Sequence, residues 1–215
     1  LMNEKAELVK SFKTDVQFLD KYLDNIGFEY GQLISITGEQ ESGKTTLLNQ
    51  ILSGIAKNEK LLYFSLEFNK RQLKKHFKKM LKDKSITQSA LGNIKVITND
   101  MFSGEIYELI EILNHKDNEP YSIIGIDSAL MLFIQELNGE QETTEIFRQL
   151  HSICIKQDKT ICLIAQGSKD DNKDNRVSIF GSQKANHLVH IMLNLTFDRR
   201  KDKRELEFAK NKQNG

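Results

Sequence analysis

Short apolar runs recur along the chain, and stretches with helical spacing separate most of them. The runs cover residues 33–37, 61–66, 94–98, 122–126, 160–165, 191–197 and 205–209. This alternation is typical of α/β proteins, in which a mostly parallel, twisted sheet carries crossover helices on both faces. The last two runs lie too close together for an intervening helix. We therefore expect residues 198–204 to form a hairpin turn and the sheet to be mixed at that end.

A helical pattern also precedes the first strand-like run. Its apolar positions are Leu8, Phe12, Val16, Leu19 and Leu23. They predict a helix within residues 4–23, and Thr14 and Asp15 offer caps for a second, separate helix. Residues 1–30 are thus expected to be a helical lead-in. A chain of 215 residues is long enough for one sizeable α/β domain and short for two, so we expect a single domain over residues 1–215.

The polar segment after the first strand-like run is the most informative motif of the chain. It reads Gly38-Glu39-Gln40-Glu41-Ser42-Gly43-Lys44-Thr45 and fits the phosphate-binding pattern G-x-x-x-x-G-K-[ST] at every fixed position. Glycines let the backbone wrap around an anion, and a helix that begins near Lys44 adds its positive dipole end. Leu47, Leu48, Ile51 and Leu52 share one face of that helix.

The motif predicts specific contacts with a nucleoside triphosphate. Residues 38–46, including Thr46, would surround the phosphates, and Lys44 would reach the β and γ phosphates. Thr45 supplies a hydroxyl for Mg²⁺, a hard ion that prefers oxygen ligands and shares its shell with phosphates and water. We therefore predict ATP or a similar nucleotide, together with Mg²⁺, as the cofactors.

Three predicted strands end in side chains that suit nucleotide hydrolysis. Asp127 follows the buried run 122–126, a position from which a carboxylate holds Mg²⁺ through its water shell. Glu67 follows the run 61–66 and is the candidate general base for the attacking water. Gln166 follows the run 160–165, and its amide could touch both the γ phosphate and a neighbouring loop. An exposed polar residue at a strand end is the alternative interpretation for each.

Composition narrows the class of protein without naming a partner. The formal net charge of +1 neither supports nor excludes nucleic acid. No apolar run approaches the length of a membrane span and no signal peptide is evident, so a cytoplasmic protein without membrane contact is expected. Cys154 and Cys162 lie in apolar segments without metal or redox spacing, and we interpret both as reduced core residues.

Residues 70–82 form the most basic stretch of the chain. Leu73, Phe77, Met80 and Leu81 predict one apolar stripe, which leaves the lysines on the wet face of a helix. His76 is expected to be a surface or boundary residue rather than a ligand. Two interpretations of the basic face stay open: an ordinary solvated face, and a surface that binds nucleic acid or another partner.

In their order and spacing, the motifs resemble one family. The matching pieces are Phe18-Leu19-Asp20, Gly31-Gln32-Leu33, the phosphate-binding loop, Phe64-Ser65-Leu66-Glu67, Ile126-Asp127, residues 145–150 and Ala165-Gln166. Together they look like the RecA-fold motor domain of bacterial replicative helicases of the DnaB type. Residues 178–182 and Lys184-Ala185 are also similar to the related Twinkle-type helicases.

The resemblance implies a RecA-like P-loop ATPase that forms a homo-oligomeric ring, with a hexamer as one candidate size. Each ATP would lie between two subunits, and single-stranded DNA would lie in the central channel. By resemblance, Glu67 is the catalytic glutamate, Asp127 the metal-side aspartate and Gln166 the link to the DNA loop. The family would place a channel loop at residues 169–180. Its candidate DNA contacts are Lys169, Lys173, Arg176 and Lys184. A mobile polar surface loop is the alternative.

Departures from the family keep other functions open. The basic pair that reaches the neighbouring subunit's nucleotide in the family matches Lys210 and Lys212. A lysine lacks the planar, two-pronged contact of an arginine with phosphate, which predicts weak activation in trans. A DNA helicase acting in replication is the leading hypothesis. A regulatory ATPase that switches assembly, and a recombination mediator that does not unwind DNA, are the alternatives.

Overall fold

The computed structural model describes residues 9–135, 137–169, 177–179 and 182–213. Its centre is a seven-stranded sheet with the strand order β11-β10-β3-β7-β6-β4-β5. The strands are β3 (Leu33–Gly38), β4 (Leu61–Ser65), β5 (Ile94–Thr98), β6 (Ile123–Asp127), β7 (Thr160–Ile164), β10 (Ile191–Asp198) and β11 (Lys203–Asn211). All neighbours pair in parallel except β10 and β11, which form an antiparallel hairpin. The predicted α/β class and the mixed end of the sheet are confirmed.

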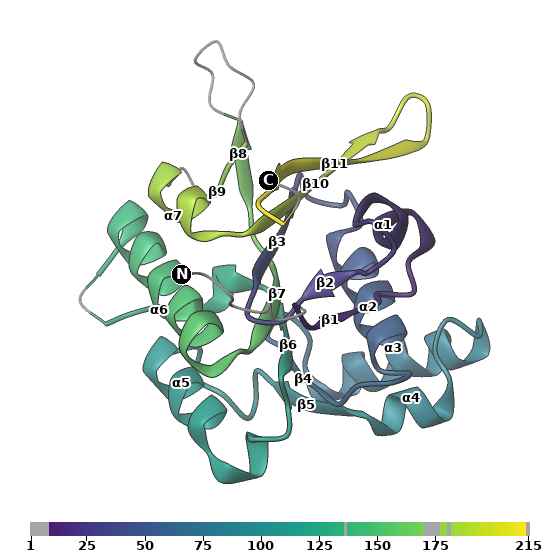
Figure 1. Ribbon diagram of the computed structural model, residues 1–215, viewed down its shortest axis with the longest axis horizontal. Coiled ribbons are helices and arrows are strands. Elements are labelled where there is room, and N and C mark those ends of the chain that lie inside the picture. The colour runs from purple at the N-terminus through teal and green to yellow at the C-terminus, as the bar shows by residue number, and fades with distance from the viewer. Residues whose placement is uncertain (1–8, 136, 170–176, 180–181, 214–215) are drawn as a thin grey trace, which may run out of the picture.

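Helices cover both faces of the sheet (Figure 1). On one face lie α2 (Lys44–Ile55), α3 (Lys70–Lys82) and α4 (Gln88–Gly92), whose buried side chains share one apolar cluster. On the other face lie α5 (Ile106–Asn114), α6 (Gly139–Gln157) and α7 (Gln183–Leu188), which share a second cluster. Short 3-10 helices occur at Lys116–Asn118 and Ala129–Met131. The central strands are buried on both sides, as expected for a parallel sheet.

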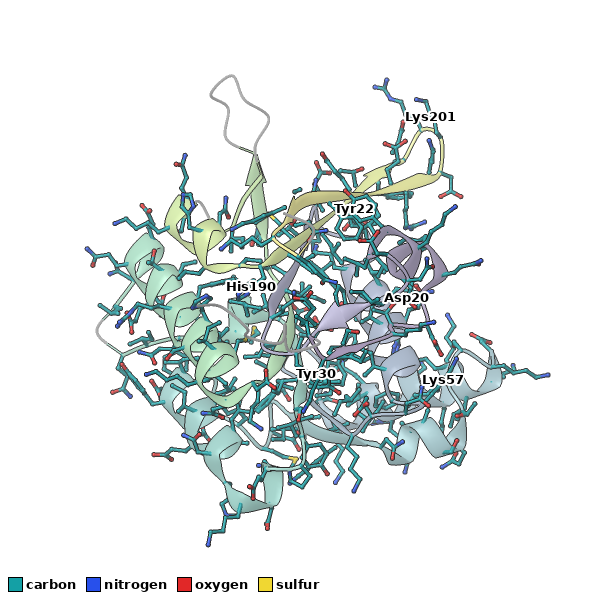
Figure 2. The ribbon with its side chains drawn as sticks, viewed as in Figure 1. Asp20, Tyr22, Tyr30, Lys57, His190 and Lys201 are labelled. Carbon is teal, nitrogen blue, oxygen red and sulfur yellow. The ribbon has the colours of Figure 1, made fainter. Side chains whose placement is uncertain are left out.

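The lead-in differs from its prediction. Within its described part, strand β1 (Ser11–Phe12) pairs with β2 (Phe28–Glu29), and helix α1 covers only Gln17–Tyr22. The carboxylate of Asp20 accepts hydrogen bonds from Thr14 N at 2.9 Å and from Thr14 Oγ1 at 2.8 Å, which fixes a turn before the helix. Figure 2 shows Asp20 and Tyr22 on α1. The ring of Tyr22 stacks on that of Phe208 in β11, with the ring centres 3.8 Å apart. The helix predicted within residues 4–23 is therefore wrong for Ser11–Phe12.

Several smaller predictions can be compared with the described residues. The stripe on α3 is confirmed, since Leu73 and Met80 are buried and Phe77 and Leu81 pack against the same cluster. Both cysteines are free and buried, and burial raises the pKa of each thiol.

Among the helices that the structure describes, none is long and apolar enough to cross a membrane. A separate hairpin of β8 (Gly167–Lys169) and β9 (Val177–Ile179) follows Gln166.

Candidate nucleotide-binding site

The phosphate-binding loop joins β3 to α2, and its two fixed glycines have a clear steric reason. Gly43 is the N-cap of α2 with a φ of 105°, in the left-handed region that side chains rarely adopt. Gly38 has a φ of 144°, and a Cβ there would lie 2.1 Å from Leu195 O of the neighbouring strand β10. Because the loop leads directly into the first turn of α2, the free N–H groups of that turn face the loop and favour an anion.

A cavity of about 1360 Å³ opens at this edge of the sheet. Of the predicted nucleotide contacts, its walls include Gly38, Glu39, Gln40, Glu41, Gly43, Lys44, Thr45 and Thr46. Ser42, another residue of the loop, is buried and does not line the cavity. Glu67, Asp127 and Gln166 also line the cavity. These three residues are far apart in sequence, but they meet because parallel strands place their carboxyl ends at one edge.

Lys44 is held over the loop by main-chain carbonyls. Its Nζ donates hydrogen bonds to Gly38 O at 2.9 Å and to Glu39 O at 2.7 Å. Burial lowers the pKa of Lys44, while the nearby carboxylates of Glu67 and Asp127 raise it in part. A phosphate close to Nζ would favour the charged form of Lys44, as the two carboxylates do. The half-buried ammonium is therefore suited to bind phosphate.

Asp127 is the most perturbed acid of the cavity. Its Oδ1 accepts a hydrogen bond from Thr45 Oγ1 at 3.4 Å, and its Oδ2 accepts one from Tyr63 Oη at 3.2 Å. Burial, followed by repulsion from Glu67, raises the pKa of Asp127 to about 6, although Thr45, Tyr63 and Lys44 oppose the change. The charges of Asp127, Glu67 and Lys44 are thus coupled within this cavity.

The donor set at this point fits Mg²⁺ bound together with phosphate. A hydroxyl and a carboxylate, the oxygens of Thr45 and Asp127, are ligands that a hard cation prefers. A cation would also relieve the repulsion between Asp127 and Glu67. No group of three or more His, Cys, Asp or Glu residues that could hold a metal occurs among the described residues. When Mg²⁺ binds beside phosphates in proteins, it usually keeps phosphate oxygens and water among its ligands.

The electrostatic cost at Asp127 predicts a stabilising substitution. The folded pKa of about 6 lies above the ordinary 3.8, so the penalty on the charged carboxylate is full above that pKa and fades as the pH falls through it. We expect Asp127→Asn to raise the free energy of unfolding of the nucleotide-free protein by about 1 to 3 kcal/mol near neutral pH. Urea unfolding across the pH range checks this. The parent and the variant should converge in acid, and a constant difference at all pH values would contradict it.

Glu67 is exposed at the mouth of the cavity and oriented by one neighbour. Ser128 Oγ donates a hydrogen bond of 2.5 Å to Glu67 Oε1, and Ser128 directly follows Asp127 on β6. This contact engages only Oε1 of Glu67, which also lines the cavity. Gln166 is exposed at the end of β7 and is followed at once by β8. The sequence patterns had not indicated Ser128 or Tyr63 as parts of the site.

A second contribution that the motifs had not indicated comes from the β10–β11 hairpin. Arg204 Nε donates a hydrogen bond to Ser42 O at 3.1 Å, and its guanidinium lies 4.1 Å from the ring centre of Phe197. Arg199 forms an exposed ion pair of 2.8 Å with Glu41. Arg204 lines the cavity beside Leu206 and, from α1, Phe18. The hairpin therefore supports the loop from the side opposite Glu67.

Of the remaining predicted residues, Lys184, Lys210 and Lys212 do not line the cavity. Lys210 Nζ donates to Asn186 O at 2.5 Å and Lys212 Nζ to His187 O at 2.9 Å, both at the end of α7. Burial, with Lys212 nearby, lowers the pKa of Lys210 to about 8. Lys184 is exposed on α7. Lys169 belongs to strand β8, whereas Lys173 and Arg176 fall outside the described residues.

Comparison with known proteins gives consistent matches. The family model described as "ATPase: KaiC" matches residues 12–212. "DNA repair protein RadA" of Aquifex aeolicus (strain VF5) is 25% identical over 203 residues, which cover 93% of this chain and 41% of that protein. RadA of Helicobacter pylori (strain ATCC 700392 / 26695) is 27% identical over 219 residues, which cover 97% of this chain and 43% of that protein. This chain thus spans about two fifths of the length of these relatives.

A solved structure agrees on the fold. The crystal structure of KaiC-like protein PH0186 from Pyrococcus horikoshii OT3 superposes with a TM-score of 0.66. The alignment covers 95% of this chain and 89% of that one, at 20% sequence identity. A likeness at this identity concerns the arrangement of helices and strands, and it agrees with the sheet and helices described above.

Proposed function

This chain belongs to the KaiC family of RecA-fold ATPases, and from that membership we propose that it hydrolyses ATP in the cavity beside the phosphate-binding loop and couples hydrolysis to single-stranded DNA. One observation carries the catalytic part of the proposal. Lys44, Thr45, Asp127 and Glu67 come from three separate segments and line one cavity. Their chemistry supplies a phosphate-binding cation, two metal-type oxygen ligands and a base.

The chain's own residues have distinct roles in this proposal. The N–H groups of the loop and of the first turn of α2 bind the phosphates, and Lys44 neutralises charge on the β and γ phosphates. Thr45 and Asp127 would hold Mg²⁺, which supplies charge neutralisation on the phosphates when bound. Arg204 fixes the loop through Ser42 O, so the phosphate-binding N–H groups keep their direction.

Glu67 is proposed as the general base. Its Oε1 is held by Ser128, so the carboxylate can orient a water for attack on the γ phosphorus and accept the proton as the new P–O bond forms. The bond from that phosphorus to the bridging oxygen breaks, and ADP leaves with the electron pair. Gln166 lies on the neighbouring strand end, where its amide can report the state of the γ phosphate to the β8–β9 hairpin.

Single-stranded DNA is proposed as the partner on two grounds. The matched relatives carry the name DNA repair protein, although only about two fifths of their length is matched. In addition, Gln166 leads directly into β8, and residues 169–176 of the following segment contain three basic residues beside three aspartates. A homo-oligomeric ring in which Lys210 and Lys212 approach the neighbour's nucleotide, and a helicase activity of the replicative type, are finer parts of the same proposal.

A regulatory ATPase that switches its assembly is the second candidate. It is favoured by Lys210 and Lys212, which donate to carbonyls of their own α7 and so couple the chain's end to that helix. Size-exclusion chromatography with and without ATP, run beside ATPase assays with and without single-stranded DNA, separates the two candidates. ATP-dependent assembly without any DNA effect on turnover would favour the switch.

Coupling to DNA is tested by two complementary variants. Gln166→Ala should keep DNA affinity but lose stimulation of hydrolysis by DNA, because it removes the relay and no charge. The triple change Lys173→Ala, Arg176→Ala and Lys184→Ala should lose DNA affinity and its steep salt dependence while keeping basal ATP binding. Fluorescence anisotropy with labelled single strands and a phosphate-release assay give both readouts. If the parent binds no single-stranded DNA at low salt, even with a non-hydrolysable ATP analogue, the DNA part of the proposal fails.

A further inference from the structure

Helix α3 presents an unbroken cationic face to solvent. Its exposed cations are Lys70, Arg71, Lys74, Lys75, Lys78, Lys79 and Lys82. The helix contains no carboxylate. Its opposite side is anchored in the core by Leu73 and Met80, so the direction of the charged face is fixed by packing. In a chain with a formal net charge of only +1, this one helix therefore carries seven of the 31 Lys and Arg residues without a carboxylate among them.

These charges are not neutralised by the surrounding fold. In the part of the chain that the structure describes, no carboxylate forms an ion pair with a cation of α3. A weaker attraction links Lys70 to Asp100, whose pKa it helps to lower. Like charges four residues apart repel each other along the helix. Helix α6 differs from α3 in this respect, because its Arg148 forms an ion pair of 2.8 Å with Glu145 on the same helix.

A merely solvated face does not account for this pattern. Glutamate and lysine have similar helix propensities, so water contact alone gives no reason to exclude carboxylates. Repulsion between the cations instead makes the bare face costly. It is relieved when an anionic partner lies against the helix. The one-sided composition therefore indicates a polyanion as the partner.

The surface is separate from the sites discussed above. None of the residues that line the nucleotide cavity belongs to α3. In Figure 1 the β8–β9 hairpin, which follows Gln166, lies at the top of the view, whereas α3 lies lower, on the right. Lys57, at the end of α2, lies near this side of the molecule (Figure 2), but it is paired with Asp15 at 2.9 Å.

We propose that the cationic face of α3 binds the phosphate backbone of a nucleic-acid duplex. Two rows of cations run along the helix, Lys70, Lys74, Lys78 and Lys82 in one and Arg71, Lys75 and Lys79 in the other. Residues four apart are separated by about 6 Å along a helix axis, so the first row extends for roughly 18 Å and the second for roughly 12 Å. A duplex offers one negative charge per about 1.7 Å of its axis, about twice the density of one of its strands, so the cations of both rows find more phosphates within reach along a duplex than along a flexible single strand.

Two further features select a duplex over other polyanions. None of the large exposed apolar side chains belongs to α3, so the face lacks the aromatic platforms on which unpaired bases stack. The apolar stripe of α3 is packed in the core and cannot enter a lipid surface, as an interfacial helix must. Contacts to phosphates alone make binding independent of base sequence and strongly dependent on salt.

The test reverses one charge in each row, with Lys74→Glu and Lys79→Glu in the same chain. Each new carboxylate has basic residues three and four positions away, so the helix should be retained. The matched control is Lys116→Glu with Lys156→Glu, two exposed lysines on the opposite face of the sheet that give the same change in net charge. Binding of a fluorescent duplex is followed by anisotropy from about 50 to 200 mM salt.

The expected result is a loss of duplex affinity of at least about tenfold at low salt and a salt slope smaller by about two in the α3 variant, with the control close to the parent. Equal loss in both variants, or no loss in either, overturns the proposal. A larger loss for a single strand of the same sequence, or preferential binding of phosphatidylserine vesicles or polyglutamate by the parent, overturns the assignment to a duplex. ATP hydrolysis measured in the same samples tests the proposed function separately, since the inference does not depend on it.

Discussion

Lys44→Ala is expected to abolish useful ATP binding. The side chain supplies the cation of the loop, and its Nζ is already placed by Gly38 O and Glu39 O at the site where phosphates would lie. Removing one partner from a desolvated, hydrogen-bonded charge pair costs about 2 to 5 kcal/mol, which corresponds to a loss of affinity of roughly 30-fold to several thousand-fold. Isothermal titration calorimetry with ATP and Mg²⁺ measures it directly.

The control for this substitution is Lys60→Ala, an exposed lysine that follows α2 and does not line the cavity. It should bind ATP like the parent. Far-ultraviolet circular dichroism must show that Lys44→Ala is folded, which we expect because its half-buried ammonium already bears a desolvation cost. A folded variant with unchanged ATP affinity would remove the loop from the nucleotide site.

Much of this site follows from the sequence because its parts are local or repeat a simple rule. The loop between β3 and α2 is one contiguous segment, and its glycines are explained by the backbone angles that they adopt. Glu67, Asp127 and Gln166 each follow an apolar run. Once the runs are recognised as parallel strands, their ends must share one edge.

The support from the β10–β11 hairpin could not be predicted in the same way. Arg204 reaches Ser42 because β10 pairs with β3, with Leu195 beside Gly38, and because β11 then folds back along β10. The pairing of β10 with β11 also includes a shift of register between Met192 and Leu193. Neither the order of strands in the sheet nor such a shift leaves a periodic signal in the chain.

The lead-in shows a different limit. Apolar spacing predicted a helix over residues that include Ser11 and Phe12, but pairing with Phe28–Glu29 competes with that helix. The turn that starts α1 depends on three hydrogen bonds to the single carboxylate of Asp20. Tertiary contacts of this kind override local propensity, since a short helix gains little stability by itself.

Glu67→Gln should separate binding from chemistry. The amide keeps the size of the side chain and an oxygen that can accept the hydrogen bond from Ser128, so ATP affinity should stay close to that of the parent. The amide cannot accept a proton from water, and turnover should fall by about 10² to 10⁴, the usual contribution of a positioned base. Single-turnover hydrolysis with excess protein measures this step apart from product release.

Two companion variants make the result for Glu67 specific. Glu111→Gln, an exposed carboxylate on α5 away from the cavity, should hydrolyse ATP at the parent rate. Ser128→Ala keeps the base but removes its 2.5 Å hydrogen bond, and we expect a smaller loss of turnover with little change in ATP affinity. Hydrolysis by Glu67→Gln at the parent rate would mean that another group activates the water. A loss confined to ATP binding would instead give Glu67 a role in holding the nucleotide, since a base acts only on the step that transfers the proton.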